Sequence, residues 1–174
     1  LGEAPIDTEF AKMLIDKGVA KDDSNAFIGG FHSGEHNIEV QIPFIQHAAK
    51  LAGKPISIVP ITLGIFDYSK VSKFAKEFTE VLKSALESGK SIKILASSDM
   101  THKEISNPRQ PASEVEQAKS ADSKVIEAIK AMNPEEVMKW ASKTTVCGPQ
   151  NITALTIIAK ELGYNNPKVL SHYT

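Results

Sequence analysis

The stretch that decides the predicted fold is Ser91-Ile92-Lys93-Ile94-Leu95-Ala96-Ser97-Ser98-Asp99-Met100-Thr101-His102. Its first half is a short apolar run with β-branched residues, and it follows Gly89, which ends a predicted helix. This pattern is typical of a buried strand in a layered α/β sheet. Ligands of open α/β sheets bind beyond the carboxyl ends of the strands, which is where Asp99 and His102 fall. We therefore expect these two residues at a functional site, with a solvated turn as the simpler alternative.

The composition narrows the class of protein. A chain of 174 residues is long enough for one domain with its own core. Lys plus Arg number 20 and Asp plus Glu 21, and this balance argues against a nucleic-acid or anionic-membrane surface. A single cysteine cannot form an intramolecular disulfide, and no apolar run reaches membrane-spanning length or resembles a signal peptide. We expect a cytoplasmic chain that binds neither nucleic acid nor membrane.

A second unusual stretch is Glu35-His36-Asn37-Ile38-Glu39-Val40-Gln41-Ile42-Pro43-Phe44-Ile45. Its isoleucines follow helical spacing, and Ser33 is a candidate N-cap. We expect a central, largely buried helix with a kink or a break at Pro43, because proline has no N–H to donate. Glu35 suits the positive end of the helix dipole. For His36, a neutral ring bonded to a neighbouring group is the alternative to a binding role.

The other predicted elements alternate along the chain. Apolar spacing predicts helices over 7–17, 67–88 and 114–131, a short helix that starts at Pro134, and a last helix that ends at Gly163. Short apolar runs predict further strands over 56–63 and 169–172. Long helices between separated strands indicate an α/β fold in which helices flank a layered sheet.

Cys147 lies just before the start of the last predicted helix, where exposed N–H groups favour a thiolate. A buried, inert side chain is the alternative. Cys147, His102 and Asp99 are the residue types of a nucleophile, its base and an orienting carboxylate. The same three types also bind transition metals. No Cys-x-x-Cys, His-Glu-x-x-His or glycine-rich phosphate loop decides between these interpretations.

Three stretches together resemble the Memo family, namely residues 35–44, 97–102 and 146–148. Their order and spacing fit the family, and the similarity spans nearly the whole chain. The resemblance implies a fold like that of class III extradiol ring-cleaving dioxygenases, whose iron is held by two histidines and one carboxylate. It implies that Cys147 replaces that carboxylate as a metal ligand, and that His102 is an acid/base group with Asp99 beside it. It also places His36 and Glu35 in the pocket.

The chain departs from the family pattern near its N-terminus. The two metal-binding histidines of the family lie in Pro-His-Ala-Gly-like and Ser-His-His-like segments, and neither occurs here. His32, His47 and His172 do not match them. Because the chain begins at Leu1 and stops at Thr174, we expect one Memo-like domain over 1–174 that lacks the N-terminal part and the C-terminal end of the family.

The resemblance implies a dioxygenase-like pocket that binds iron or copper with a redox role and admits a small molecule or a peptide. If the protein is an enzyme, we expect a metal-dependent oxidoreductase. Ring cleavage itself is less expected, because a thiolate alters the ligand field and is itself oxidisable. Two alternatives are a non-catalytic binding module that uses the same pocket and a cysteine-dependent hydrolase.

Overall fold

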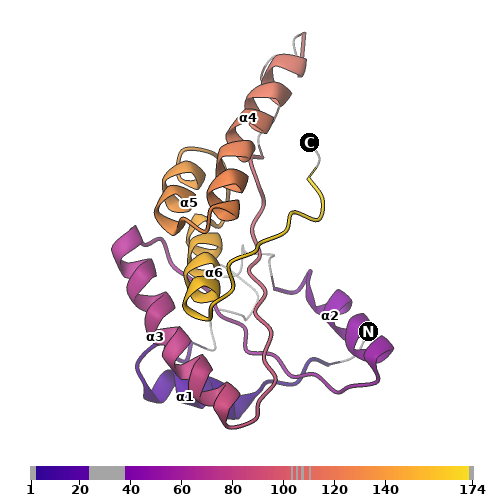
Figure 1. Cartoon of the computed structure of the whole chain (residues 1–174). Helices are drawn as coiled ribbons and strands as arrows, with labels where there is room; N and C mark the ends of the chain where they lie inside the picture. Colours follow the sequence, from indigo (N-terminus) through magenta and orange to yellow (C-terminus); the bar gives the residue numbers. More distant parts are fainter. Residues whose placement is uncertain are drawn as a thin grey trace. The chain divides into compact units, whose positions relative to one another are not determined.

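The computed structural model describes residues 3–23, 38–102, 104, 106, 108–109 and 111–172 (Figure 1). The helices of this described part are α1 (Thr8–Asp16), α2 (Ile42–Ala52), α3 (Tyr68–Glu87), α4 (Pro111–Lys130), α5 (Pro134–Ala141) and α6 (Pro149–Glu161). Its β pairing is a single parallel bridge between Ile6 and Ile58, and no strand or sheet is assigned in these ranges. The predicted layered sheet flanked by helices is therefore wrong.

The stretches predicted as strands show why. Residues 56–63, 92–96 and 169–172 have no regular secondary structure apart from the bridge at Ile58. Leu95, in the run predicted to be a buried strand, is 61% exposed, and Leu170, in the last predicted strand, is 94% exposed. A short apolar run supplies the side-chain pattern of a strand, but a ladder also needs hydrogen bonds to a neighbouring backbone. Among the described residues that neighbour exists only at Ile6.

The contacts group the chain into two compact units, which are described separately. Unit 1 comprises Leu1–Thr62 and Val81–Ser91, and unit 2 comprises Leu63–Glu80 and Ile92–Thr174. The predicted helix over 67–88 is confirmed as α3, which runs through the boundary between the units. The assignment of one domain over 1–174 stays a prediction.

In unit 1, the predicted first helix is confirmed as α1. The Asp7 carboxylate accepts a hydrogen bond from the Phe10 N–H at 2.9 Å, which caps the helix. Phe10 and Leu14 are buried. The Lys90 ammonium forms ion pairs with Asp7 at 3.1 Å and with Glu9 at 2.8 Å. This pairing fastens the residues that follow α3 to the start of α1.

Also in unit 1, α2 begins at Ile42, so Pro43 stands in the first turn and not in the helix interior. Proline is well suited to that position because its missing N–H would have no helical partner there. The predicted helix that kinks or breaks at Pro43 is therefore wrong, because the helix begins there and continues to Ala52. The predicted burial is wrong too, since α2 has no buried residue and Phe44 is 73% exposed. Glu35 and His36 lie outside the described residues.

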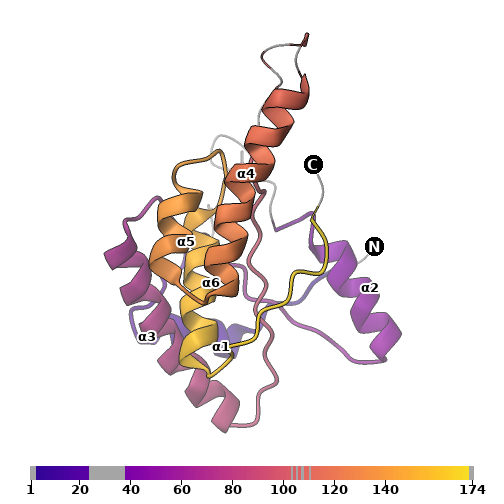
Figure 2. The same ribbon diagram turned by 45° about the horizontal axis from the view of Figure 1, so that its top comes forward.

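In unit 2, α5 contacts both α4 and α6 (Figures 1 and 2). Val125 of α4, Ala141 of α5 and Val146 form a buried apolar cluster. Met100 and Trp140 pack against this cluster. Met100 belongs to the stretch Ser91–His102, so the core of unit 2 holds the end of that stretch in place.

The starts of the last two helices are confirmed. Asn133 Oδ1 accepts a hydrogen bond from the Glu136 N–H at 3.2 Å, and Pro134 is the first residue of α5. Gly148 is the N-cap residue of α6. None of the helices in the described ranges combines the length and the apolar character needed to cross a bilayer.

Candidate functional site

Two segments of unit 2 meet at the predicted site. Residues 97–102 precede α4, and residues 145–151 include the start of α6. Five hydrogen bonds join them: Asp99 N–H to Cys147 Sγ (3.1 Å), Gly148 N–H to Ser98 Oγ (2.9 Å), Asn151 Nδ2 to the Ser97 carbonyl (2.9 Å), His102 N–H to Thr145 Oγ1 (2.9 Å), and a longer one between Ser98 Oγ and Cys147 Sγ (3.8 Å). We call these two segments the Cys147 cluster.

Cys147 is exposed, and two groups of the 97–102 segment lie beside its sulfur. The Asp99 N–H points at Sγ, and Ser98 Oγ lies 3.8 Å from it. Cys147 directly precedes Gly148, the N-cap residue of α6. The exposure of Cys147 excludes the alternative of a buried, packed side chain.

Ser98 and Gly148 pack closely beside that sulfur. Ser98 Oγ accepts the Gly148 N–H and lies 3.0 Å from the Asp99 carbonyl, to which its hydroxyl can donate. A Cβ added at Gly148 would lie 2.9 Å from Ser98 Cβ, which is closer than real Cβ atoms approach. Any side chain at residue 148 would therefore collide with Ser98, so glycine is the residue that fits there without a shift.

The ring of His102 is oriented by its own segment. His102 Nδ1 lies 3.1 Å from the Met100 carbonyl oxygen. A carbonyl oxygen can only accept, so Nδ1 carries the proton, and in the neutral ring Nε2 keeps its lone pair. His102 is exposed. Its Nε2 is therefore available to take up a proton or to bind a ligand.

Asp122 of α4 connects the Cys147 cluster to the C-terminal segment. Its side chain is 3% exposed. Oδ1 accepts the Thr101 N–H at 2.9 Å, and Oδ2 lies 3.2 Å from His172 Nε2. His172, which matches no family motif, thus has a structural partner 50 residues earlier in the chain.

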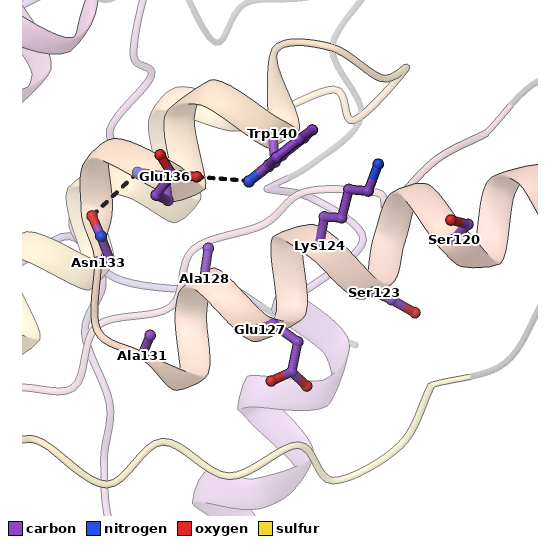
Figure 3. Close-up of a pocket in the computed structure, with 9 residues that line it drawn as sticks. All are labelled: Ser120, Ser123, Lys124, Glu127, Ala128, Ala131, Asn133, Glu136 and Trp140. Carbon is purple, nitrogen blue, oxygen red and sulfur yellow. Dashed lines mark hydrogen bonds between the residues drawn. The ribbon is translucent and has the colours of Figure 1, made fainter.

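A shallow hollow of about 490 Å³ opens between α4 and α5 (Figure 3). It is lined by Ser120, Ser123, Lys124, Glu127, Ala128, Ala131, Asn133, Glu136 and Trp140. Trp140 Nε1 donates to Glu136 Oε2 at 2.8 Å. A hydrogen bond from Lys139 to the same carboxylate holds the pKa of Glu136 below its ordinary value. The predicted site residues Asp99, His102 and Cys147 do not line this hollow.

The structure thus brings two of the predicted residues, Asp99 and Cys147, into contact through the Asp99 backbone. His102 belongs to the same cluster and is joined to it through Thr145. His36 and Glu35, the predicted pocket residues, lie outside the described residues. The roles assigned to all five residues stay predictions.

Asp122 is the residue of this region that sequence reasoning missed. The sequence does contain an indication of its burial, because Ala118, Asp122 and Val125 recur at the spacing of one helix face. All three are buried. A carboxylate on the apolar face of a helix needs a buried partner. Ser98 lay within the quoted motif, but nothing in the sequence indicated that its hydroxyl would bond the Gly148 N–H.

Within the described part of the chain, no three His, Cys, Asp or Glu side chains are grouped so that they could hold a metal ion. Cys147 by itself fits a metal ligand, because a thiolate is a soft donor that suits copper(I), zinc and iron. Catalytic zinc sites commonly use three protein ligands. A metal on Cys147 would therefore take its further ligands from outside the described residues.

The family model of Memo-like proteins matches residues 1–174, which is the whole chain. The chain belongs to the Memo family. It is 31% identical to a MEMO1 family protein of Methanococcoides burtonii over 175 residues, covering 99% of this chain and 58% of that relative. A MEMO1 family protein of Thermococcus onnurineus is 34% identical over 182 residues, covering 100% of this chain and 60% of that relative.

A third relative, from Methanopyrus kandleri, is 31% identical over 177 residues and is covered to 56% of its length. The chain thus spans less than two thirds of the length of these Memo relatives. No solved structure matches it significantly. The resemblance noted in the sequence is therefore confirmed at the level of the family.

Proposed function

We propose that the Cys147 cluster is part of a metal-binding pocket with a redox role. In this proposal Cys147 supplies a thiolate ligand to iron or copper, and the further ligands come from outside the described residues. The bound metal would supply one-electron redox chemistry. The observation that carries the proposal is the hydrogen bond from the Asp99 N–H to Cys147 Sγ at 3.1 Å.

The surroundings of Cys147 support the role of a ligand. The sulfur is exposed, so a metal can reach it. The Asp99 N–H, 3.1 Å from the sulfur, holds the thiol group in a defined position beside the 97–102 segment. Hydrogen bonds to ligating atoms also orient them and adjust the properties of the metal. The Asp99 backbone would serve in this way.

His102 and Asp99 are proposed as the proton-transfer groups of the same pocket. The Met100 carbonyl holds the Nδ1 proton of His102, which leaves Nε2 free to accept a proton from a bound molecule. Both side chains are exposed, as proton exchange with solvent requires. The molecule admitted would be a small molecule or a peptide.

The hydrolase alternative has less support. A cysteine hydrolase needs a hydrogen bond between its sulfur and its histidine. The hydrogen-bond partners of Cys147 Sγ among the described residues are Ser98 and Asp99, and Nδ1 of His102 faces Met100. The metal-ligand role matches these contacts better.

Metal analysis of the native protein, as its gene encodes it, tests the proposal. Titration with iron(II) or copper(I) under reducing conditions should give one equivalent per chain. Cys147→Ala should weaken that affinity at least about tenfold, the smallest loss usually seen when even an outer group of a metal site is removed. His47→Gln is the matched control, because His47 is an exposed imidazole on α2 whose loss should change nothing. Equal affinity in wild type and Cys147→Ala would refute the proposal.

A further inference from the structure

We propose that Asp122 is a positioning residue, which sets the tautomer of His102 through the peptide group between Met100 and Thr101. This inference rests on the proposed function of the Cys147 cluster, because it assigns Asp122 a role in preparing His102 for proton transfer. Asp122 touches neither the sulfur nor the imidazole of that cluster. Its action would pass entirely through the backbone.

Asp122 is a buried residue of α4. A buried carboxylate is costly unless it is hydrogen-bonded. Here Oδ1 receives the Thr101 N–H at 2.9 Å, and Oδ2 faces His172 Nε2 at 3.2 Å. Buried charges contribute little net stability, since apolar residues of similar volume often serve as well. The geometry that Asp122 imposes therefore explains its presence better than stability does.

The hydrogen bond to Asp122 also acts on the Met100 carbonyl, because the peptide bond between Met100 and Thr101 is planar. The Thr101 N–H and the Met100 carbonyl belong to one rigid peptide group and point in opposite directions in its trans form. When Asp122 fixes the direction of this N–H, it also fixes the direction of the carbonyl. That carbonyl is the acceptor 3.1 Å from Nδ1 of His102. The carboxylate thus determines where His102 finds an acceptor for its ring proton.

The position of the proton on Nδ1 of His102 determines the state of its other ring nitrogen, Nε2. With its proton held on Nδ1, the neutral ring presents an unprotonated Nε2. His102 also donates its backbone N–H to Thr145 Oγ1. This hydrogen bond keeps the residue in the cluster but does not select a tautomer of the ring. Asp122 is the described residue whose loss would release the Met100 carbonyl without removing any atom of His102.

His172 has a secondary part in this arrangement. Its Nε2 lies against Oδ2, so it restrains the carboxylate from the side opposite Thr101. His172→Gln keeps a polar side chain there and leaves Oδ1 free to hold the Thr101 N–H. We expect this variant to retain the His102 tautomer, which separates positioning by Asp122 from a general loosening of the C-terminal segment.

Nitrogen-15 NMR of the His102 ring tests the proposal, at about pH 8, where an ordinary imidazole is neutral. The wild type should show Nδ1–H as the major tautomer. Asp122→Leu, which keeps the buried volume filled, and Asp122→Ala should each lower the ratio of Nδ1–H to Nε2–H about fivefold or more, the equivalent of one lost hydrogen bond. Asp122→Asn retains an acceptor oxygen and should restore most of the wild-type ratio.

Val137→Ala is the matched structural control. Val137 of α5 is fully buried and does not belong to the apolar cluster against which Met100 packs, so its truncation should destabilise the chain without acting on the Met100 carbonyl. Its His102 tautomer ratio should stay at the wild-type value. An unchanged ratio in a folded Asp122→Leu or Asp122→Ala chain would overturn the proposal, as would an equal change in Val137→Ala. The ratio is measured without metal, so a failed metal titration would refute the proposed function alone.

Discussion

The backbone N–H of Asp99 lies 3.1 Å from the sulfur of Cys147, which follows it by 48 residues. This contact places an exposed cysteine against the segment that carries His102. It depends on a close fit between Ser98 and Gly148 next to it, since those residues join the same two segments. The geometry of the Cys147 cluster can therefore be disturbed without altering a chemically active side chain.

Gly148→Ala should disturb it by steric conflict alone. The added Cβ would lie 2.9 Å from Ser98 Cβ and 3.0 Å from Ser98 Oγ, so Ser98 would have to move. Overpacking of this kind typically lowers the free energy of unfolding by about 1–3 kcal/mol. Urea unfolding measures the loss, and the double variant Ser98→Gly/Gly148→Ala should regain part of it because the conflict is removed. A Gly148→Ala chain as stable as wild type would show that the fit is not tight.

Cys147 should be alkylated in the folded chain at neutral pH at least as fast as in the unfolded chain. The sulfur is exposed, so the reagent reaches it without any unfolding of the chain. Iodoacetamide labelling followed by mass spectrometry gives both rates, and the chain has no other cysteine to confuse the reading. If labelling occurred only after unfolding, the exposed position of Cys147 would be incorrect.

The stability of unit 1 should depend on Asp7 in acid. The pKa of Asp7 is lowered mainly by the hydrogen bond from the Phe10 N–H, against an opposing effect of burial, and Lys90 lowers it further. A depressed folded-state pKa stabilises the fold above the unfolded pKa of about 3.9, and this contribution is lost as the pH falls through the folded value. The stability difference between wild type and Asp7→Asn, measured by urea unfolding, should therefore shrink as the pH falls from about 5 to 2. A difference independent of pH would contradict the role of its charge.

Trp140 should report the titration of Glu136, because it is the chain's single tryptophan and its indole N–H donates to that carboxylate. The hydrogen bond from Lys139 lowers the pKa of Glu136, so the carboxylate should persist below its ordinary range near about 4.3. We expect the fluorescence of Trp140 to show a step at a pH below that range, where Glu136 takes up its proton. Glu136→Gln has no carboxylate there and should show no such step. Lys139→Gln should move the step upward. A step that stayed in place in Lys139→Gln would remove Lys139 as the cause.

Helices were largely predictable from the sequence because their signals are local. Asp7 and Asn133 mark helix starts by hydrogen bonds within a few residues, and Pro134 marks one because its missing N–H has no helical partner to lose in the first turn; the structure confirms these starts. Pro43 carried the correct signal too, but it was placed in a helix interior because the apolar pattern was extended backward from Ile42. As a residue of the first turn, it marks the start of α2.

The absence of a sheet among the described residues could not be predicted in the same way, because a strand forms only when a second backbone pairs with it. The runs around Leu95 and Leu170 have the composition of strands, yet among the described residues only Ile58 finds a partner. In the candidate site, side-chain chemistry pointed to Asp99, His102 and Cys147. The contact between Asp99 and Cys147 is made by a backbone N–H. Every residue except proline has this group, so the residue types gave no indication of the contact.

X-ray absorption at the metal edge of the native protein loaded with iron or copper tests most directly whether Cys147 is a metal ligand. If Cys147 is a ligand, the spectrum should show a sulfur neighbour at about 2.3 Å, the length of a typical zinc–thiolate bond, and this neighbour should disappear in Cys147→Ser. A spectrum that contains only nitrogen and oxygen neighbours, identical in wild type and Cys147→Ser, would contradict it.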